Sequence, residues 1–236
     1  NSRNIIKNLN LEIEGGKSTA IVGPTGCGKS TLTKLLFRFY DPHKGEISID
    51  KQKLKDCKMD SIRSIIGVVP QDTIMFNNTI GYNLSYGNPN ASIKEIRKVV
   101  ELCNLDDFIE SLDLKYETIV GERGLKLSGG EKQRIAIARM MLKKPKILIL
   151  DEATSALDSK TEKLVLDSID EYFKNNTKII IAHRLTTIRN SDKIVVMSKG
   201  KIIEQGKHSN LIKNKGLYCE MWNKQKEIKK QVNLVN

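Results

Sequence analysis

A run of nine residues, GPTGCGKST, has the composition and spacing of a loop that binds phosphate. The fixed positions of the pattern G-x-x-x-x-G-K-S are occupied by Gly23, Gly28, Lys29 and Ser30. The glycines allow successive backbone N–H groups to turn toward one anion, and a helix that follows directs its positive end to the same point. The predicted nucleotide-binding residues are Gly23, Pro24, Thr25, Gly26, Cys27, Gly28, Lys29, Ser30 and Thr31.

The charged and hydroxyl groups of this run indicate which phosphates are bound. Lys29 is suited to neutralise the β- and γ-phosphates of a nucleotide, and the Ser30 hydroxyl is suited to bind Mg²⁺. Cys27 lies inside the loop, where a small filler is the favoured role and a reactive thiol is the alternative. The run therefore predicts a site for a nucleoside triphosphate.

An acidic pair follows an apolar stretch later in the chain. In ILILDE, the apolar residues predict a buried strand, and Asp151 lies at its carboxyl end, where open α/β sheets bind ligands. Asp151 is suited to hold Mg²⁺ through water, and Glu152 to orient and deprotonate an attacking water. Taken alone, the two acids could mark only the start of a loop. Beside a phosphate loop they predict a nucleoside triphosphate hydrolase.

A second stretch, GERGLKLSGGEKQR, resembles another anion site. Ser128, Gly129 and Gly130 stand directly before an amphipathic run and are expected to open a helix. The first turn of a helix has backbone N–H groups without intrahelical acceptors, so this helix start offers a hydroxyl and N–H groups to an anion. A chain with one complete phosphate loop thus contains a second helix start of the same kind.

The elements that must position these residues indicate an α/β fold with a mostly parallel sheet. Strands are expected at 18–22, 146–150 and 178–181, and IIGVVP is expected to be a strand that ends before Gln71. KIVVM and GKIIEQG are expected to pair as a hairpin, and STLTKLLFRFY to form a helix that begins near Lys29. Between Gln71 and Lys144 the apolar residues have helical spacing, and the tail from Tyr218 to Asn236 is expected to be a polar helix that frays.

This organisation predicts three segments along the chain. Residues 1–71 form the first part of an ATP-binding core, whose first strand is expected to be missing. Residues 72–144 form a helical lobe inserted into the sheet domain, and residues 145–236 form the second part of the core with a helical tail.

Composition narrows the classes of function. The chain has 236 residues and a net charge of +12, from 40 basic and 28 acidic residues. The lysines are spread along the chain without interleaved aromatic residues, which favours a solvated surface over a nucleic-acid site. No run approaches the ~18 apolar residues of a transmembrane helix, so the chain is not expected to span a membrane by itself. Cys27, Cys57, Cys103 and Cys219 have no metal or redox spacing and are expected to be free thiols.

The motifs together resemble one family. LSGGEKQR is similar to the signature of the ATP-binding cassette (ABC) ATPases, and the family's other motifs stand in order around it. Gln71 follows IIGVVP, SALD ends at Asp158, and His183 follows KIIIA. The resemblance covers essentially the whole chain. It implies a phosphate-loop (P-loop) NTPase core with a mostly parallel sheet and an inserted helical signature subdomain.

This resemblance implies a role for the second helix start. In ABC ATPases two domains meet head to tail, and Ser128, Gly129 and Gly130 would contact the ATP held by the partner's phosphate loop. Asp158 would contact that loop as well. The implied ligands are ATP and Mg²⁺, and the implied partner is a second nucleotide-binding domain in a homodimer of half-transporters. The isolated domain is expected to be monomeric without ATP.

The resemblance also implies the catalytic set, which consists of Glu152, His183, Gln71 and Lys29. Gln71 would contact Mg²⁺ and the attacking water, and its loop would report the nucleotide state to a membrane domain. His183 would bond the γ-phosphate and hold the water in line with Glu152. The implied metal ligands are Ser30, Gln71 and Asp151. Taken alone, Gln71 could be a polar loop residue and His183 a buried histidine with a structural partner.

Two classes of ABC ATPase remain, exporters and soluble ATPases that act on nucleic acid or ribosomes. The short helical lobe and the single cassette favour an exporter. VGERG before the signature resembles the exporter segment that touches the coupling helices of the transmembrane domains, through Glu122 and Arg123. Stretches such as LLFRFYDPHKGEI and GLYCEMW look like the mitochondrial and heavy-metal-tolerance half-transporters, which implies the mitochondrial inner membrane. Multidrug and peptide exporters are the second possibility.

The sequence departs from the family pattern at two places. Lys51 follows EISID where the family usually has a glycine, so the turn there is expected to be strained. The family also stacks adenine on an aromatic residue in a strand before IIKNLNLEI. The chain, which we expect to be a fragment of a longer protein, begins at Asn1 and is expected to lack that residue.

Overall fold

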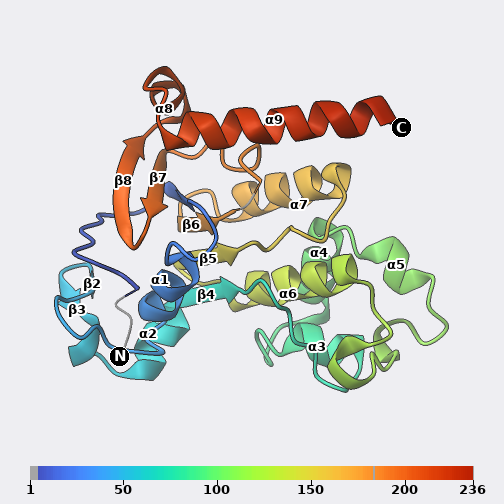
Figure 1. Ribbon diagram of the computed structural model, residues 1–236. Coiled ribbons are helices and arrows are strands. Elements are labelled where there is room, and N and C mark those ends of the chain that lie inside the picture. The colour runs from blue at the N-terminus through green and yellow to red at the C-terminus, as the bar shows by residue number, and fades with distance from the viewer. Residues whose placement is uncertain (1–4, 183, 236) are drawn as a thin grey trace. The chain divides into compact units, whose positions relative to one another are not determined.

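The structure is a computed structural model that describes residues 5–182 and 184–235, with side chains described as far as residue 227. Figure 1 shows its helices and strands, which divide into two compact units. The first unit consists of Asn1–Ile66, Ile149–Asp151 and Thr177–Asn236, and the second of Gly67–Leu148 and Glu152–Asn176. The predicted fold class, α/β with a mostly parallel sheet, is confirmed.

A six-stranded sheet carries the first unit. Its strands are β4 (Ile66–Val69), β5 (Ile147–Asp151), β6 (Thr177–Ile181), β1 (Ser18–Val22), β7 (Lys193–Ser198) and β8 (Lys201–Gly206), in that hydrogen-bonded order. β1 is parallel to β6 and to β7, and β7 pairs with β8 in an antiparallel hairpin. The strands predicted from apolar runs and the hairpin are confirmed, because a strand buried on both faces needs a continuous apolar run.

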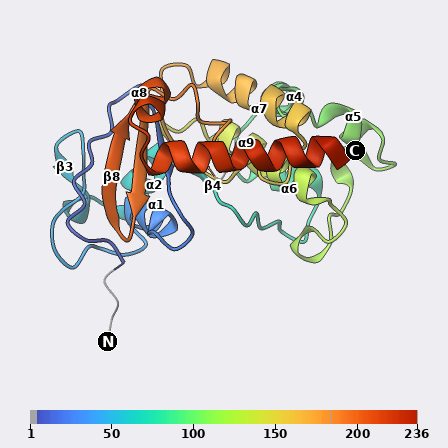
Figure 2. The same cartoon turned by 45° about the horizontal axis from the view of Figure 1, so that its top comes forward.

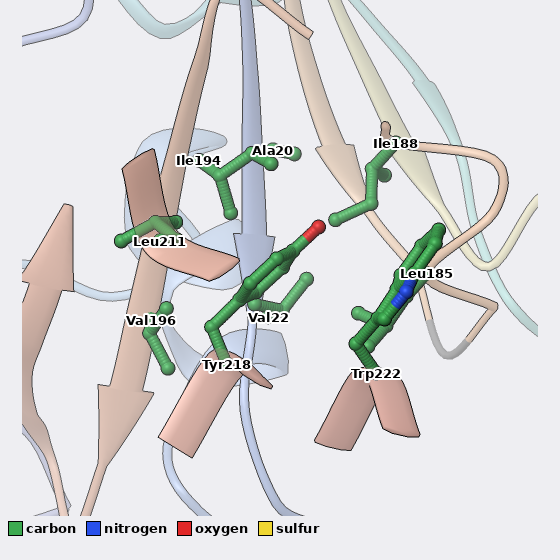
Figure 3. Packing of buried hydrophobic residues seen from close by; sticks show 9 residues of the cluster. All are labelled: Ala20, Val22, Leu185, Ile188, Ile194, Val196, Leu211, Tyr218 and Trp222. Atoms are coloured by element: carbon green, nitrogen blue, oxygen red, sulfur yellow. The ribbon is translucent and has the colours of Figure 1, made fainter. Parts of the chain in front are cut away.

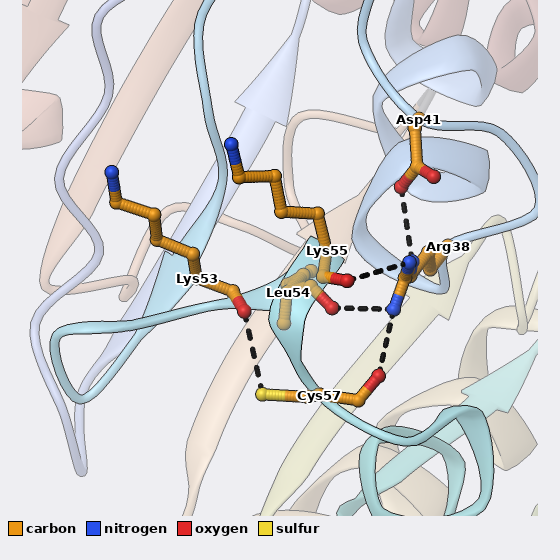
Figure 4. Close-up of polar contacts among 6 residues, drawn as sticks. All are labelled: Arg38, Asp41, Lys53, Leu54, Lys55 and Cys57. Carbon is orange, nitrogen blue, oxygen red and sulfur yellow. Dashed lines mark hydrogen bonds and ion pairs between the residues drawn. The ribbon is translucent and has the colours of Figure 1, made fainter.

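Helix α1 (Lys29–Leu36) begins where the sequence predicts but ends before the apolar run does. Arg38 adopts a left-handed backbone conformation with φ 52°, which stops the helix. Its Nη1 donates to the carbonyl oxygens of Leu54 and Cys57 at 2.5 and 2.8 Å, and its Nη2 donates to the Lys55 oxygen at 3.0 Å (Figure 4). The helix therefore ends where Arg38 is required to hold another segment.

The segment that Arg38 holds was not predicted. It consists of the short strands β2 (Ser48–Ile49) and β3 (Gln52–Lys53), the 3₁₀ helix η1 (Leu54–Asp56) and helix α2 (Met59–Ile65). Between β2 and β3, Asp50 and Lys51 have φ 49° and 66°. The left-handed backbone expected at Lys51, where relatives have glycine, is thus present.

The core of the first unit lies between the sheet and the C-terminal helices. It contains Ala20, Val22, Leu185, Ile188, Ile194, Val196, Leu211, Tyr218 and Trp222 (Figure 3). Tyr218 and Trp222 lie one turn apart on α9 (Leu217–Val235), and only 0% and 8% of their surfaces are exposed. The tail is a helix as predicted, but the expectation that it is polar is wrong at its start, because these two residues share a face that the core covers.

A short helix joins this core to the end of the sheet. Helix α8 (His208–Lys213) packs against β8 and α9 (Figures 1 and 2). The Nδ1 atom of His208 lies 2.8 Å from the Tyr218 hydroxyl, and its ring meets the Trp222 ring edge to face at 4.5 Å. Burial lowers the pKa of His208 and raises the pKa of Tyr218 to about 12. Both groups are therefore neutral at pH 7.

The second unit is helical. Its α-helices are α3 (Ile80–Ser85), α4 (Ile93–Leu102), α5 (Asp106–Glu110), α6 (Gly129–Lys143) and α7 (Ser159–Tyr172), with the 3₁₀ helices η2 (Lys115–Glu117) and η3 (Glu122–Gly124). α6 contacts α3 and α4, and its Ile135, Ile137 and Met141 are fully buried. Thr79, Ser92, Ser128 and Asp158 cap the helix starts, as the helical spacing of this segment requires. No helix in the described part of the chain is both long and apolar enough to cross a membrane.

We expect Arg38→Lys to lower the free energy of unfolding by about 1–3 kcal/mol, because a lysine cannot reach three carbonyl groups with one planar fork. Urea denaturation followed by circular dichroism measures the change. The control is Asp41→Asn, which removes the more exposed partner of Arg38 and should lower stability by less than about 1 kcal/mol. Equal losses in the two variants would contradict the role given to the carbonyl contacts.

Candidate active site

The predicted phosphate loop connects β1 to α1 with a backbone that only glycine adopts easily. Gly23, Gly26 and Gly28 have φ values of 152°, 78° and 113°. A β-carbon on Gly23 would lie 2.1 Å from the Met197 carbonyl oxygen on β7, so no side chain fits there. Gly28 is the N-cap of α1, and no side chain in the described part of the chain caps this end. The first N–H groups of α1 are thus left for a ligand.

Lys29 is drawn into the loop. Only 6% of its surface is exposed, and its Nζ donates to the carbonyl oxygens of Gly23 at 2.8 Å and Pro24 at 3.3 Å. Cys27 is buried with its Sγ 4.0 Å from the same nitrogen, so it fills space beside the cation. Ser30, in the first turn of α1, is exposed. A buried cation, backbone N–H groups and a hydroxyl thus meet at one helix start, which suits a phosphate with a bound metal ion.

The acidic pair lies where the sequence predicts it. Asp151 is the last residue of β5 and is only 8% exposed. Glu152 is half-buried and has φ 51°, a left-handed conformation that residues other than glycine rarely adopt. After it the chain turns, with hydrogen bonds from Ser155 N to the Glu152 oxygen and from Leu157 N to the Thr154 oxygen, both 3.1 Å long. A strained residue at a strand end is typical of a functional position.

The signature residues form the start of α6 in the second unit. Ser128 is the N-cap, its Oγ accepts from Glu131 N at 3.3 Å, and its own N–H donates to Glu131 Oε2 at 2.7 Å. Ser128 and Gly129 are exposed, and Gly130 is half-buried. The predicted helix start is therefore present, with a capping box in place.

Asp158 begins helix α7 of the same unit. Its Oδ1 accepts hydrogen bonds from the backbone N–H groups of Lys160 and Thr161, both at 3.0 Å. The side chain and backbone of Thr161 lower the pKa of Asp158, so the carboxylate is ionised at pH 7. In this structure Asp158 is an N-cap on the surface, and its contact with a partner's loop stays a prediction.

The remaining predicted residues are placed as follows. Gln71 is exposed, one residue after the Pro70 that follows β4. Glu122 and Arg123 are exposed on η3, where Arg123 has φ 49°. His183 lies outside the described residues. Their functional roles stay predictions.

Two features of the second unit escaped the sequence analysis. The first is Gln133 on α6, whose exposed fraction is 4% and whose side chain binds the turn after Glu152. The second is a surface of Ile74, Phe76, Tyr82 and Tyr86, which we call the aromatic patch; its members are 70%, 37%, 44% and 54% exposed. A polar residue on the buried face of an amphipathic helix, such as Gln133, is the signal that could have indicated the first.

Arg139 and Asn83 fix the aromatic patch. The Arg139 guanidinium lies 5.6 Å from the Phe76 ring and 5.8 Å from the Tyr86 ring. Its Nε and Nη2 donate to the Asn83 backbone oxygen and Oδ1 at 2.9 and 3.0 Å. Asn83, fully buried, also exchanges two hydrogen bonds with the Phe76 backbone. Burial lowers the pKa of Arg139. An exposed aromatic surface on such a rigid support indicates a binding surface.

A strand that ends in a glycine-rich loop, followed by a helix that begins at a buried lysine in an α/β fold, defines a phosphate-loop nucleotide-binding domain. A sequence model described as ABC transporter matches residues 6–155. The chain therefore belongs to the ABC transporter family.

Known relatives resemble nearly all of the chain. "Iron-sulfur clusters transporter ABCB7, mitochondrial" of Danio rerio is 50% identical over 222 residues, which are 94% of this chain and 30% of that protein. "ATM1-type heavy metal exporter" of Novosphingobium aromaticivorans is 51% identical over 223 residues, or 94% of this chain and 37% of that protein. The resemblance to mitochondrial and heavy-metal half-transporters that the sequence indicates is confirmed.

A solved structure is similar as well. "Structure of a bacterial Atm1-family ABC exporter with ATP bound" superposes with a TM-score of 0.93 and 50% sequence identity, covering 94% of this chain and 39% of that one. The chain thus spans about a third of the length of the relatives it matches.

The left-handed backbone at Glu152 leads to a test of strain at the site. We expect Glu152→Gly to be more stable than Glu152→Ala by about 1 kcal/mol, because glycine adopts this φ without a clash of its β-carbon. Both variants lose the carboxylate, so the comparison isolates the backbone. Urea denaturation of the two variants measures the difference. A Glu152→Ala variant as stable as Glu152→Gly would show that the backbone is not strained.

Proposed function

We propose that this chain is the ATP-hydrolysing domain of an ABC exporter, working as a head-to-tail dimer with residues 72–144 as its signature subdomain. The observation that carries the proposal is the phosphate loop, where the buried Lys29 and the uncapped start of α1 face the same point. The relative of known structure is described as having ATP bound, which supports ATP as the nucleotide.

The residues of the site divide between binding and hydrolysis. Lys29 and the N–H groups of the loop hold the β- and γ-phosphates. Ser30, Gln71 and Asp151 offer oxygen donors, which suit Mg²⁺, since this ion is held by one or two side chains together with phosphate oxygens and water. The ion would neutralise charge on the phosphates. Glu152 accepts the proton of the attacking water, and His183 holds that water in line.

The start of α6 completes the site of a partner domain. Ser128 and Gly129 are exposed at a helix N-terminus, which suits the γ-phosphate of a nucleotide held by another chain. Asp158 is exposed, ionised and on the surface of the same unit, where it can meet the partner's loop. The second helix start is therefore half of a site, and ATP joins the two halves.

A membrane partner is supported by the aromatic patch. It lies in the chain segment directly after Gln71, and Glu122 and Arg123 are exposed on the same unit. We propose that these groups dock on the coupling helices of transmembrane domains, at the mitochondrial inner membrane, in a homodimer of half-transporters. The relatives' names, an iron–sulfur cluster transporter and a heavy metal exporter, favour this over a soluble ATPase that acts on nucleic acid.

We expect Glu152→Gln to convert the isolated chain from a monomer into an ATP-dependent dimer. Glutamine keeps the size of the side chain but cannot accept a proton, and loss of a general base lowers a rate by about 10²–10⁴. ATP then persists and bridges the two chains. Light scattering after size-exclusion chromatography, with ATP and sodium and then with ADP, measures the mass. A dimer with both nucleotides, or rapid hydrolysis by the variant, would contradict the proposal.

A matched control separates the partner's site from the chain's own. Adding Ser128→Arg to Glu152→Gln should prevent dimer formation while monomer affinity for ATP stays nearly unchanged, because the serine faces the other chain's nucleotide. Equilibrium titration with a fluorescent ATP analogue measures the affinity. A large loss of monomer affinity would show that Ser128 serves its own chain's ATP.

We expect the aromatic patch to be covered in the full-length protein. A cysteine introduced by Tyr82→Cys should react with a maleimide several times faster in this chain than in the membrane-embedded full-length protein, because docking buries the patch. Ile203→Cys, at another exposed apolar position, is the control and should react equally in both. Peptide mass spectrometry separates these sites from native cysteines. Equal protection at both positions would exclude specific docking on the patch.

A further inference from the structure

Gln133 connects two parts of the second unit that have separate predicted roles. It lies on α6 in the turn that follows Ser128, and 4% of its surface is exposed. Its Oε1 accepts from Ala156 N at 2.9 Å, and its Nε2 donates to Ser155 Oγ at 2.9 Å and to the Glu152 carbonyl oxygen at 3.4 Å. One buried amide therefore binds the turn after Glu152 at three points.

The turn that Gln133 binds contains the strained backbone of the site. Glu152 has φ 51°, and such a conformation persists only where surrounding contacts hold it. The hydrogen bond from Ser155 N to the Glu152 oxygen closes the turn from within, and the Gln133 amide holds the same carbonyl from α6. A carbonyl that is fixed from both sides fixes the direction in which the Glu152 side chain leaves the backbone.

The same turn also touches the start of α6. A β-carbon on Gly129 would lie 3.3 Å from the Ala156 β-carbon, and one on Gly130 would lie 3.4 Å from the Ala156 oxygen. The signature glycines and the turn thus pack with almost no space between them, so a displacement of the helix start must move Ala156. Gln133 accepts from the N–H of that same residue and carries the displacement to Glu152.

We infer that Gln133 is a positioning residue that sets the Glu152 backbone and couples it to the Ser128–Gly130 helix start. This inference rests on the proposed head-to-tail dimer, in which the helix start contacts one ATP and Glu152 acts on the other. Gln133 then connects the two ATP sites within a single chain. Binding of the partner's γ-phosphate at α6 aligns the base for the chain's own ATP, and hydrolysis is cooperative.

The test is the kinetics of Gln133→Met in the full-length protein reconstituted in lipid. Methionine keeps the volume of the buried side chain but removes the donor and acceptor groups. We expect kcat to fall about tenfold or more and the KM for ATP to change less than about threefold, because the phosphate loop is untouched. The Hill coefficient for ATP should fall toward 1. The same substitution at the exposed Gln52 is the control and should leave all three quantities unchanged.

A second variant keeps the inference testable if Gln133→Met does not fold. Ser155→Ala removes an exposed partner of the Gln133 amide and should lower kcat in the same direction by a smaller factor. Where both variants fold, their effects on kcat should be non-additive in the double variant. Wild-type kcat and Hill coefficient in Gln133→Met, unchanged kcat in Ser155→Ala, or additive effects would overturn the inference. Failure of the proposed function would appear instead in the wild-type protein, as absent ATP hydrolysis.

Discussion

The close approach of the phosphate loop to strand β7 is the constraint on which the rest of the site depends. Val22 pairs with Val196 in the parallel register of β1 and β7, and Gly23 leaves β1 so near the next residue, Met197, that a β-carbon would lie 2.1 Å from its carbonyl oxygen. Because Gly23 is fixed against the sheet, its own carbonyl is fixed too, and Lys29 donates to it at 2.8 Å. The sheet therefore sets the position of the cation.

The parts of the fold that depend on local pattern could be predicted from the sequence. Buried strands such as β1 and β6 need continuous apolar runs, and the glycines of the loop need left-handed φ, so both leave a local record. Contacts between distant segments leave none. The end of α1 at Leu36 depends on carbonyl groups near Cys57, and the burial of Trp222 depends on a core to which several strands contribute.

The same distinction applies to the candidate site. Its motif residues could be found because their order and spacing are short-range, and the structure places Lys29, Asp151 and Ser128 at the helix starts and strand end expected of them. Gln133 and Asn83 could not be found in this way. Each is a buried amide whose partners are fixed by folding, since Gln133 binds Ala156 and Asn83 binds Phe76 and Arg139. Supporting residues of a site are thus less legible than the groups they support.

The starts of α1 and α6 differ in charge, and this difference explains why one of them needs a partner. α1 has no acidic residue in its first turn and contains Lys29. α6 has Glu131 in its first turn, and the capping box uses the Ser128 and Glu131 N–H groups within the chain. A carboxylate at a helix start opposes the binding of another anion there, so α6 gains little from phosphate alone. In the proposed dimer, the partner's lysine and Mg²⁺ arrive with the phosphate and offset that repulsion, which makes the attraction between chains depend on bound ATP.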